Sequence, residues 1–192
     1  MQNLSTVARR RDLLARGHTP GSLRSALKHR QIERVSRDLY SIAAAADSIT
    51  ERHSYVEAAK LVPHGVFCLI SALVFHALTT QVNQRMQIAL PRPAFEPKVP
   101  FLDVQYLHLS KAPFEYGVEE HLCEGAMIKV YSPAKTVADM FKFRNKLGTD
   151  LALEALREVW RLRTATVAEL DAAARVCRVD KIMKPYLEAT VT

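Results

Sequence analysis

Positive charge is concentrated at the N-terminal end of this chain. Residues 1–40 carry nine lysine and arginine side chains against three acidic ones, whereas the remaining residues carry 18 basic and 17 acidic side chains. A folded core does not require such asymmetry. Binding to a polyanion does, because each phosphate that Lys or Arg neutralises releases condensed counterions. The distribution therefore predicts a basic nucleic-acid-binding head followed by a nearly neutral body.

Capping residues and apolar spacing divide the head into two helices and a hairpin. Residues 7–16 are predicted to form the first helix. Thr19 offers an N-cap hydroxyl and Pro20 the favoured first helical position, which predicts a second helix over residues 20–30. Apolar residues within 32–42 flank a polar, basic tip, and this indicates a short hairpin. This order is that of a winged helix-turn-helix, in which the second helix enters the major groove.

The second helix has an outer face suited to a groove. It is small at the N-terminal end, so that the backbone can approach closely, and it is basic further along. Arg24 and Lys28 lie one turn apart on this face, where they can read a guanine edge or hold phosphates. Arg34 and Arg37 would contact phosphate from the hairpin. The predicted DNA-binding residues are Arg9, Arg10, Gly21, Ser22, Arg24, Ser25, Lys28, His29, Arg34 and Arg37.

One part of a winged helix has no room in this sequence. A further helix usually precedes the two in the head, and residues 1–6 are too few to form it. Without it, Val7, Leu23 and Leu27 need another apolar cover, since burying a leucine is worth about 1.5–3 kcal/mol. We expect the cover to come from the body, a second subunit or a longer chain start, or the head to be loose. Asp38 at the hairpin tip would oppose phosphate.

A small-residue connector separates the head, residues 1–45, from the body, residues 46–192. The body is predicted to be α+β, with a small, mostly antiparallel sheet and a helical C-terminal third. Strands are predicted at 85–90, 101–109, 117–122 and 126–131. Helices are predicted at 50–62, 66–78, 132–146, 150–163, 166–176 and 180–189.

Several patterns limit the compartment and the chemistry. The three cysteines are far apart and lack CxxC spacing, which favours reduced, buried thiols in a cytoplasmic protein. The longest apolar stretch, residues 65–78, is too short to span a bilayer, and no signal peptide opens the chain, so no membrane partner is expected. The histidines lack metal-ligand spacing, and no phosphate loop or nucleophile triad is evident. We expect no catalytic residue, no metal and no cofactor.

Two further clusters leave other interpretations open. Lys135, Asp139 and Lys142 follow Glu119 and Glu120, which suggests a metal-dependent nuclease that captures its substrate with the basic head. Their spacing lacks the acid, acid-x-lysine pattern of such sites, so we expect no enzyme. A basic row near the C-terminus is either an auxiliary nucleic-acid surface or a set of cations at a helix end, where the macrodipole favours them. It consists of Arg175, Arg178, Lys181 and Lys184.

Several strings in the body, in this order and together with the head, cover nearly the whole chain. They are PHGV at 63–66, LISAL at 69–73, HALT at 76–79, VYSPAKTVAD at 130–139, FRNK at 143–146, DLALEALR at 150–157 and RVCRVDKIMKPY at 175–186. In these strings the chain resembles the AbiEi-type antitoxins, the transcriptional-regulator half of type IV toxin–antitoxin systems of phage abortive infection.

The resemblance implies a fold and a function. Such proteins join an N-terminal winged helix to a C-terminal antitoxin domain. The head binds inverted repeats in the promoter of its own operon and represses it, as a dimer or as cooperatively bound monomers. The body counters a nucleotidyltransferase-like toxin without a stable complex, and no metal or organic cofactor is implied. Direct masking of the toxin is the alternative for the body.

Overall fold

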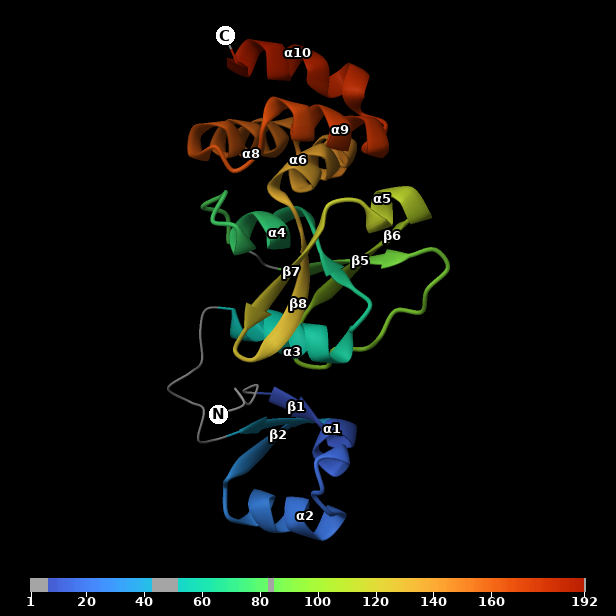
Figure 1. Ribbon diagram of the computed structural model, residues 1–192, viewed down its shortest axis with the longest axis vertical. Coiled ribbons are helices and arrows are strands. Elements are labelled where there is room, and N and C mark those ends of the chain that lie inside the picture. The colour runs from blue at the N-terminus through green and yellow to red at the C-terminus, as the bar shows by residue number, and fades with distance from the viewer. Residues whose placement is uncertain (1–6, 43–51, 83–84, 192) are drawn as a thin grey trace. The chain divides into compact units, whose positions relative to one another are not determined.

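The computed structural model describes residues 7–42, 52–82 and 85–191. In this part, ten helices and two small sheets confirm the predicted α+β class (Figure 1). The chain forms two compact units, each described by itself. Unit one comprises residues 1–64, 97–103 and 120–128, and unit two comprises residues 65–96, 104–119 and 129–192. The predicted boundary between residues 45 and 46 lies outside the described residues.

Unit one holds the basic N-terminal segment. Its elements are β1 (Val7–Arg9), α1 (Arg10–Ala15), α2 (Pro20–Lys28), β2 (Ile32–Ser36), β3 (Leu39–Ile42) and α3 (His53–Leu61). The three strands form an antiparallel sheet in the order β1-β3-β2. The predicted hairpin is confirmed, with Arg37 and Asp38 as its turn.

The prediction of a helix over residues 7–16 is wrong at its start. Val7–Arg9 is a strand, in which Val7 lies opposite Ser41 and Arg9 opposite Leu39. Val7 and Ala8 are buried, and a β-branched residue such as valine fits a half-buried sheet better than a helix. Helix α1 is therefore a short segment between β1 and the turn that leads to α2.

A small core holds unit one together. Its buried members are Ala8, Leu13, Leu23 and Tyr40, with the partly buried Leu27 and Ile32 packed against them. Helix α3 packs against β1, and Val7 on that strand is fully buried. Cover for this side of the head therefore comes from a helix that the sequence analysis assigned to the body, one of the sources it left open.

The larger sheet has the strand order β6-β5-β4-β8-β7. Its strands are β4 (Val66–Phe67), β5 (Met86–Pro91), β6 (Val104–Leu109), β7 (Val118–Cys123) and β8 (Ala126–Tyr131). Strand β4 pairs antiparallel with β5, but β4 with β8 and β5 with β6 are parallel. The expectation of a mostly antiparallel sheet is therefore wrong. The long connection between β5 and β6 allows the crossover that parallel neighbours need.

Helices form the rest of unit two. They are α4 (Leu69–Phe75), α5 (Lys111–Glu115), α6 (Pro133–Lys142), α7 (Arg144–Leu147), α8 (Thr149–Leu162), α9 (Val167–Cys177) and α10 (Asp180–Val191). Residues 133–141 of α6 are all buried, because α4, α8 and α9 pack around this helix. The helix predicted over 66–78 is instead β4 followed by α4, and the backbone changes direction at Leu69, where φ is 50°.

Two expectations, about the cysteines and about membrane-spanning segments, can be compared with the structure. All three cysteines are free and buried, as predicted. Among the helices of residues 7–42, 52–82 and 85–191, none has both the length and the apolar character needed to cross a bilayer.

Candidate nucleic-acid interface

Helix α2 is fixed at its N-terminus by a reciprocal cap. The Ser22 amide donates to Thr19 Oγ1 (3.1 Å), and the Thr19 amide donates to Ser22 Oγ (2.9 Å). Pro20 occupies the first helical turn, as the sequence predicts. Leu23 is buried against the core of unit one. Cap and core together set the rotation of α2 and therefore which of its side chains face solvent.

The outer face of α2 is exposed as predicted. Gly21, Ser22, Arg24, Ser25, Lys28 and His29 are all exposed. Arg24 and Lys28 stand one turn apart, and among the described residues no carboxylate lies within 4.0 Å of either charged group. Two long cations on one face of a fixed helix, free of internal counter-charges, can contact phosphate or the edge of a guanine.

Three polar residues of the predicted set have local partners within α2 or at its caps. Ser22 Oγ donates to the Thr19 carbonyl (2.9 Å), in addition to its role in the cap. His29 Nδ1 donates to the Ser25 carbonyl (2.8 Å), and Ser25 Oγ lies 3.4 Å from the same nitrogen. These groups form hydrogen bonds at the ends of α2. Arg24 and Lys28 are therefore the side chains of this face that are available to contact a ligand.

The hairpin between β2 and β3 carries two of the predicted arginines. Arg34 donates from Nε to the Ser36 carbonyl (3.1 Å) and from a terminal nitrogen to the Arg37 carbonyl (3.0 Å). A register shift between Arg34 and Ser36 bends the strand at this point. Arg34 therefore braces the turn, whereas Arg37 is exposed at its tip.

Arg9, Arg10 and Arg11 line the same hollow as Asp38, the acidic residue at the hairpin tip. The hollow has a volume of about 590 Å³, and Leu14 and Leu61 also line it. The Arg10 amide donates to the Asp38 carbonyl (2.9 Å). The pKa of Arg9 is lowered, mainly by partial burial and secondly by the positive charge of Arg11. The charges of Asp12 and Asp38 partly oppose this shift. Asp38 thus lies among cations, which offsets the repulsion of phosphate expected from its position at the tip.

The second basic row is mixed with acids. Arg175 pairs with Asp171 (2.6 Å) and Lys184 with Glu188 (3.8 Å). Arg175, Lys181 and Lys184 line a hollow between α9 and α10, which Asp171, Asp180 and Glu188 also line. Arg178 is the left-handed C-cap of α9. The structure therefore favours solvated cations on two helices over an auxiliary nucleic-acid surface.

The lysines and the aspartate considered for a nuclease lie in unit two, whereas Glu120 is an exposed residue of unit one. Lys135 and Asp139 are 0% and 2% exposed, and Lys135 Nζ lies 2.5 Å from Asp139 Oδ2. Lys142, in the last turn of the same helix, donates from Nζ to the Cys177 carbonyl (3.2 Å). A phosphodiester cannot reach Lys135 and Asp139 in this arrangement, so their positions are those of a structural ion pair.

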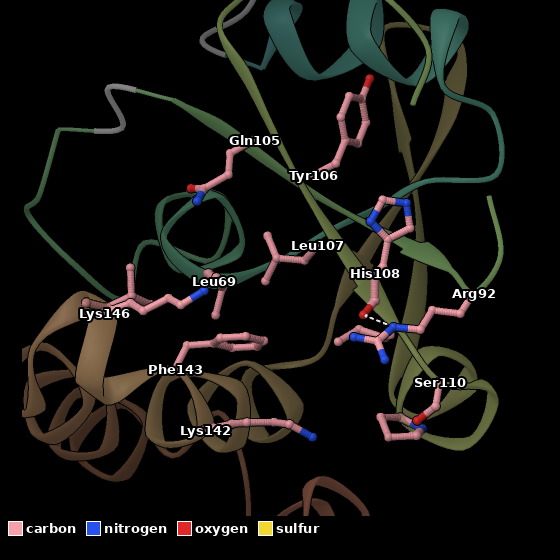
Figure 2. A pocket seen from close by; sticks show the side chains of 13 residues that line it. Leu69, Arg92, Gln105, Tyr106, Leu107, His108, Ser110, Lys142, Phe143 and Lys146 are labelled. Carbon is pink, nitrogen blue, oxygen red and sulfur yellow. Dashed lines mark hydrogen bonds between the residues drawn. The ribbon is translucent and has the colours of Figure 1, made fainter. Parts of the chain in front are cut away.

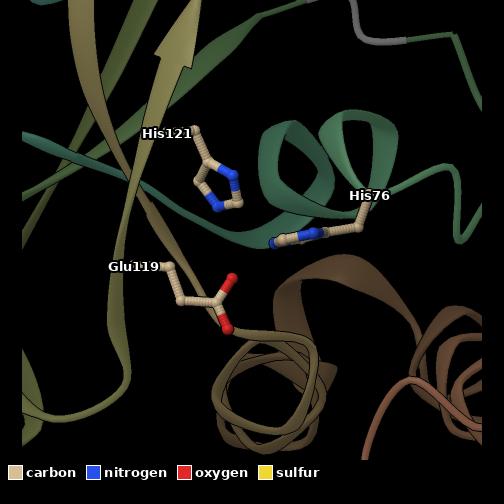
Figure 3. A group of neighbouring side chains, drawn as sticks. All are labelled: His76, Glu119 and His121. Carbon is tan, nitrogen blue, oxygen red and sulfur yellow. The ribbon is translucent and has the colours of Figure 1, made fainter.

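Figure 3 shows three side chains that the sequence analysis did not group. They are His76, Glu119 and His121, whose ligand-type atoms all lie within 4.8 Å of one another. Glu119 and His121 alternate along β7, and His76 is the C-cap of α4. The Glu-x-His spacing in a strand could have indicated the first two, but His76 is distant in sequence. The division between the units falls after Glu119, so the group is not a site of either unit.

Two comparisons with known proteins gave no match. No family model matches the chain, and no curated protein matches it significantly.

Proposed function

We propose that this chain is a DNA-binding transcriptional repressor that docks α2 in the major groove. The observation that carries the proposal is the outer face of α2. Arg24 and Lys28 are exposed there, one turn apart, and neither is paired with a carboxylate among residues 7–42, 52–82 and 85–191. Both stand on a helix whose cap and buried Leu23 fix its rotation.

The order of elements in unit one supports the same proposal. A strand, two helices and a hairpin follow one another, and the first strand pairs with the second strand of the hairpin. This order resembles that of a winged helix after its first helix, which supports the proposal. In such a head the hairpin lies along the DNA backbone, which would place Arg37 near phosphate.

The biological role that we propose rests on the resemblance to the AbiEi-type antitoxins. The chain would repress its own promoter through inverted repeats and act as the antitoxin of a type IV system in the cytoplasm. Its toxin would be nucleotidyltransferase-like and would be countered without a stable complex. Two half-sites would require two heads, because one α2 can occupy only one major-groove segment.

DNA binding is tested by fluorescence anisotropy with a duplex from the region upstream of the gene. Arg24→Ala and Lys28→Ala should each weaken binding about tenfold, the equivalent of one base-edge contact. Arg157→Ala is the matched control, because Arg157 is an exposed arginine on α8 of unit two. Unchanged binding by both α2 variants would refute the assignment of α2 as the recognition helix.

The antitoxin role is tested separately by coexpression with the product of the neighbouring gene. Relief of toxicity without co-purification would support an antitoxin that acts without a stable complex. Stoichiometric co-purification would instead show direct masking. Failure to relieve toxicity would contradict the antitoxin role and leave DNA binding to be judged by the anisotropy experiment.

A further inference from the structure

A cavity of about 530 Å³ lies within unit two, beside strand β6 and the segment where α6 leads into α7 (Figure 2). Separate parts of the sequence supply its walls: Leu69 at the start of α4, Arg92 directly after β5, residues 105–110 of β6 and the turn after it, Pro113 in α5, and residues from 142–147. Its volume is within the range of about 300–1,000 Å³ that is typical of small-molecule sites. None of its lining residues belongs to the predicted DNA-binding set, and Lys142 is the one lining residue that the sequence analysis considered, as part of the nuclease alternative.

The charged lining of the cavity is positive. Arg92, Lys142 and Lys146 line it, and no aspartate or glutamate does. Within the described part of the chain, no carboxylate lies within 4.0 Å of any of these three charged groups. The Glu96 carboxylate lies 3.6 Å from Nδ1 of the lining residue His108 and not beside these three cations. An anion that enters the cavity would therefore meet cations without internal counter-charges.

Two of these cations are held in place. Arg92 donates from Nε to the His108 carbonyl (2.9 Å), and its amide donates to the Leu109 carbonyl (2.9 Å). Lys142 is half-buried and donates from Nζ to the Cys177 carbonyl (3.2 Å). Figure 2 shows the Arg92 guanidinium and the Lys142 ammonium on the same side of the cavity. A guanidinium anchored through Nε keeps its two terminal nitrogens for an anion, and a pair of parallel hydrogen bonds to phosphate fits that geometry.

One part of the wall is apolar and includes an aromatic ring. Figure 2 shows the ring of Phe143 beside Leu69 and Leu107, farther along the cavity from Arg92. Phe143 is only half-buried, so part of its ring surface remains available. An aromatic surface close to cations suits a planar base attached to a phosphate, because a base stacks on the ring while the phosphate meets the positive charge. Gln105 and Ser110 also line the cavity and carry polar side chains.

We propose that this cavity binds a nucleoside phosphate, with the phosphate at Arg92 and Lys142 and the base against Phe143. Lys146 at the rim adds a third positive charge. The site lies entirely in unit two and does not involve α2. The proposal can therefore be tested independently of DNA binding by unit one. If it is correct, unit two has a small-molecule ligand.

Isothermal titration of the full chain with AMP, adenosine and inorganic phosphate tests the proposal. AMP should bind more tightly than either component, since only AMP meets both parts of the cavity. Arg92→Gln should weaken AMP binding about tenfold, the loss of one charge-assisted contact. Phe143→Leu should reduce the preference for AMP over inorganic phosphate. Arg157→Gln, an exposed arginine of unit two outside the cavity, is the matched control and should change neither.

Several results would overturn the proposal. These are the absence of AMP binding at millimolar concentrations, AMP binding no tighter than inorganic phosphate, or AMP binding that Arg92→Gln and Lys146→Gln both leave unchanged. Binding of a single-stranded oligonucleotide that Arg92→Gln weakens, without binding of AMP, would also overturn it, because the occupant would then be a polymer. Circular dichroism and thermal unfolding of each variant establish that a loss of binding is not a loss of fold.

Discussion

The ammonium of Lys135 lies 2.5 Å from a carboxylate oxygen of Asp139, one turn along α6, and neither side chain is accessible to solvent. Lys135 Nζ also lies 4.1 Å from the centre of the Tyr131 ring. Cys177 Sγ donates to the other carboxylate oxygen of Asp139 (3.3 Å). A buried pair of this kind adds little net stability compared with apolar side chains, but it is costly to break.

Removal of one partner should therefore destabilise the chain strongly. Asp139→Ala leaves the Lys135 ammonium buried without its counter-charge, and we expect a loss of about 3–5 kcal/mol in the free energy of unfolding. The double variant Lys135→Met with Asp139→Leu should recover most of that loss. Urea denaturation followed by circular dichroism measures both. Glu188→Ala, which removes the exposed pair with Lys184, is the control and should cost less than about 1 kcal/mol. An equal cost for Asp139→Ala and Glu188→Ala would contradict this account.

Stability should fall at alkaline pH. The pKa of Cys177 is raised from 9.0 to about 12, mainly by burial and secondly by the negative charge of Asp139. Because the folded state holds the proton more tightly than the unfolded state, the stability from the neutral thiol is complete below pH 9 and is lost progressively between pH 9 and about 12. Burial also raises the pKa of Tyr131, which adds to the loss.

Urea denaturation at about pH 8 and about pH 10 measures this slope, and Cys177→Ala should make it shallower. At about pH 8, a thiol reagent should modify Cys177 only as the protein unfolds, since the thiolate is the reactive form. Fast modification of Cys177 in the folded protein, or an unchanged slope in the variant, would show that the thiol is not buried as described.

Gly117 should not tolerate a side chain. Its φ is +68°, and a Cβ atom there would lie 2.7 Å from Lys135 Cβ and 3.0 Å from Ser132 Oγ. Gly17→Ala is the matched control, because Gly17 has a φ of +92° but no atom within 4 Å of the added Cβ. Backbone strain alone costs about 1–2 kcal/mol, so Gly117→Ala should lower the thermal unfolding temperature clearly more than Gly17→Ala. Similar losses would indicate that Gly117 has more room than the structure gives it.

Arg34 should act on DNA binding through the shape of the hairpin. Arg34→Lys keeps the positive charge but cannot donate to the Ser36 and Arg37 carbonyls together, as the guanidinium does. We expect a severalfold loss of affinity in fluorescence anisotropy, with an unchanged dependence on salt, because the number of charges at the interface stays the same. Arg37→Lys, at the exposed tip, should have a smaller effect. The reverse order of the two effects would make Arg37 the positioning residue.

Local signals in the sequence predicted much of the secondary structure. Thr19, Ser132 and Thr166 each cap a helix by accepting a hydrogen bond from the amide three residues later. Each of these signals is contained in four consecutive residues, and the structure has all three caps. The hairpin at residues 32–42 also depends on neighbours in sequence. The exposed face of α2 followed from helical spacing alone, which is why its residues could be named in advance.

Contacts between distant residues explain what the sequence analysis missed. Val7–Arg9 is a strand because β3, far along the chain, offers an edge to it. The parallel pairing of β5 with β6 depends on a long crossover. A lysine such as Lys135 is almost never fully buried, so its position in the core could not be expected from residue type. The cavity at Arg92, Lys142 and Phe143 forms only when separate segments meet.

The dependence of promoter binding on salt tests the central claim most directly. An interface with about five phosphate contacts should give a log–log slope of affinity against salt near −4.5, and the Arg24→Ala, Lys28→Ala double variant should reduce its magnitude by up to about 2 if both cations contact phosphate. Measured on the full chain by fluorescence anisotropy, a steep slope that the double variant makes shallower is the predicted result. A slope near zero, or a steep slope that the double variant leaves unchanged together with the affinity, would contradict the proposal that α2 binds DNA.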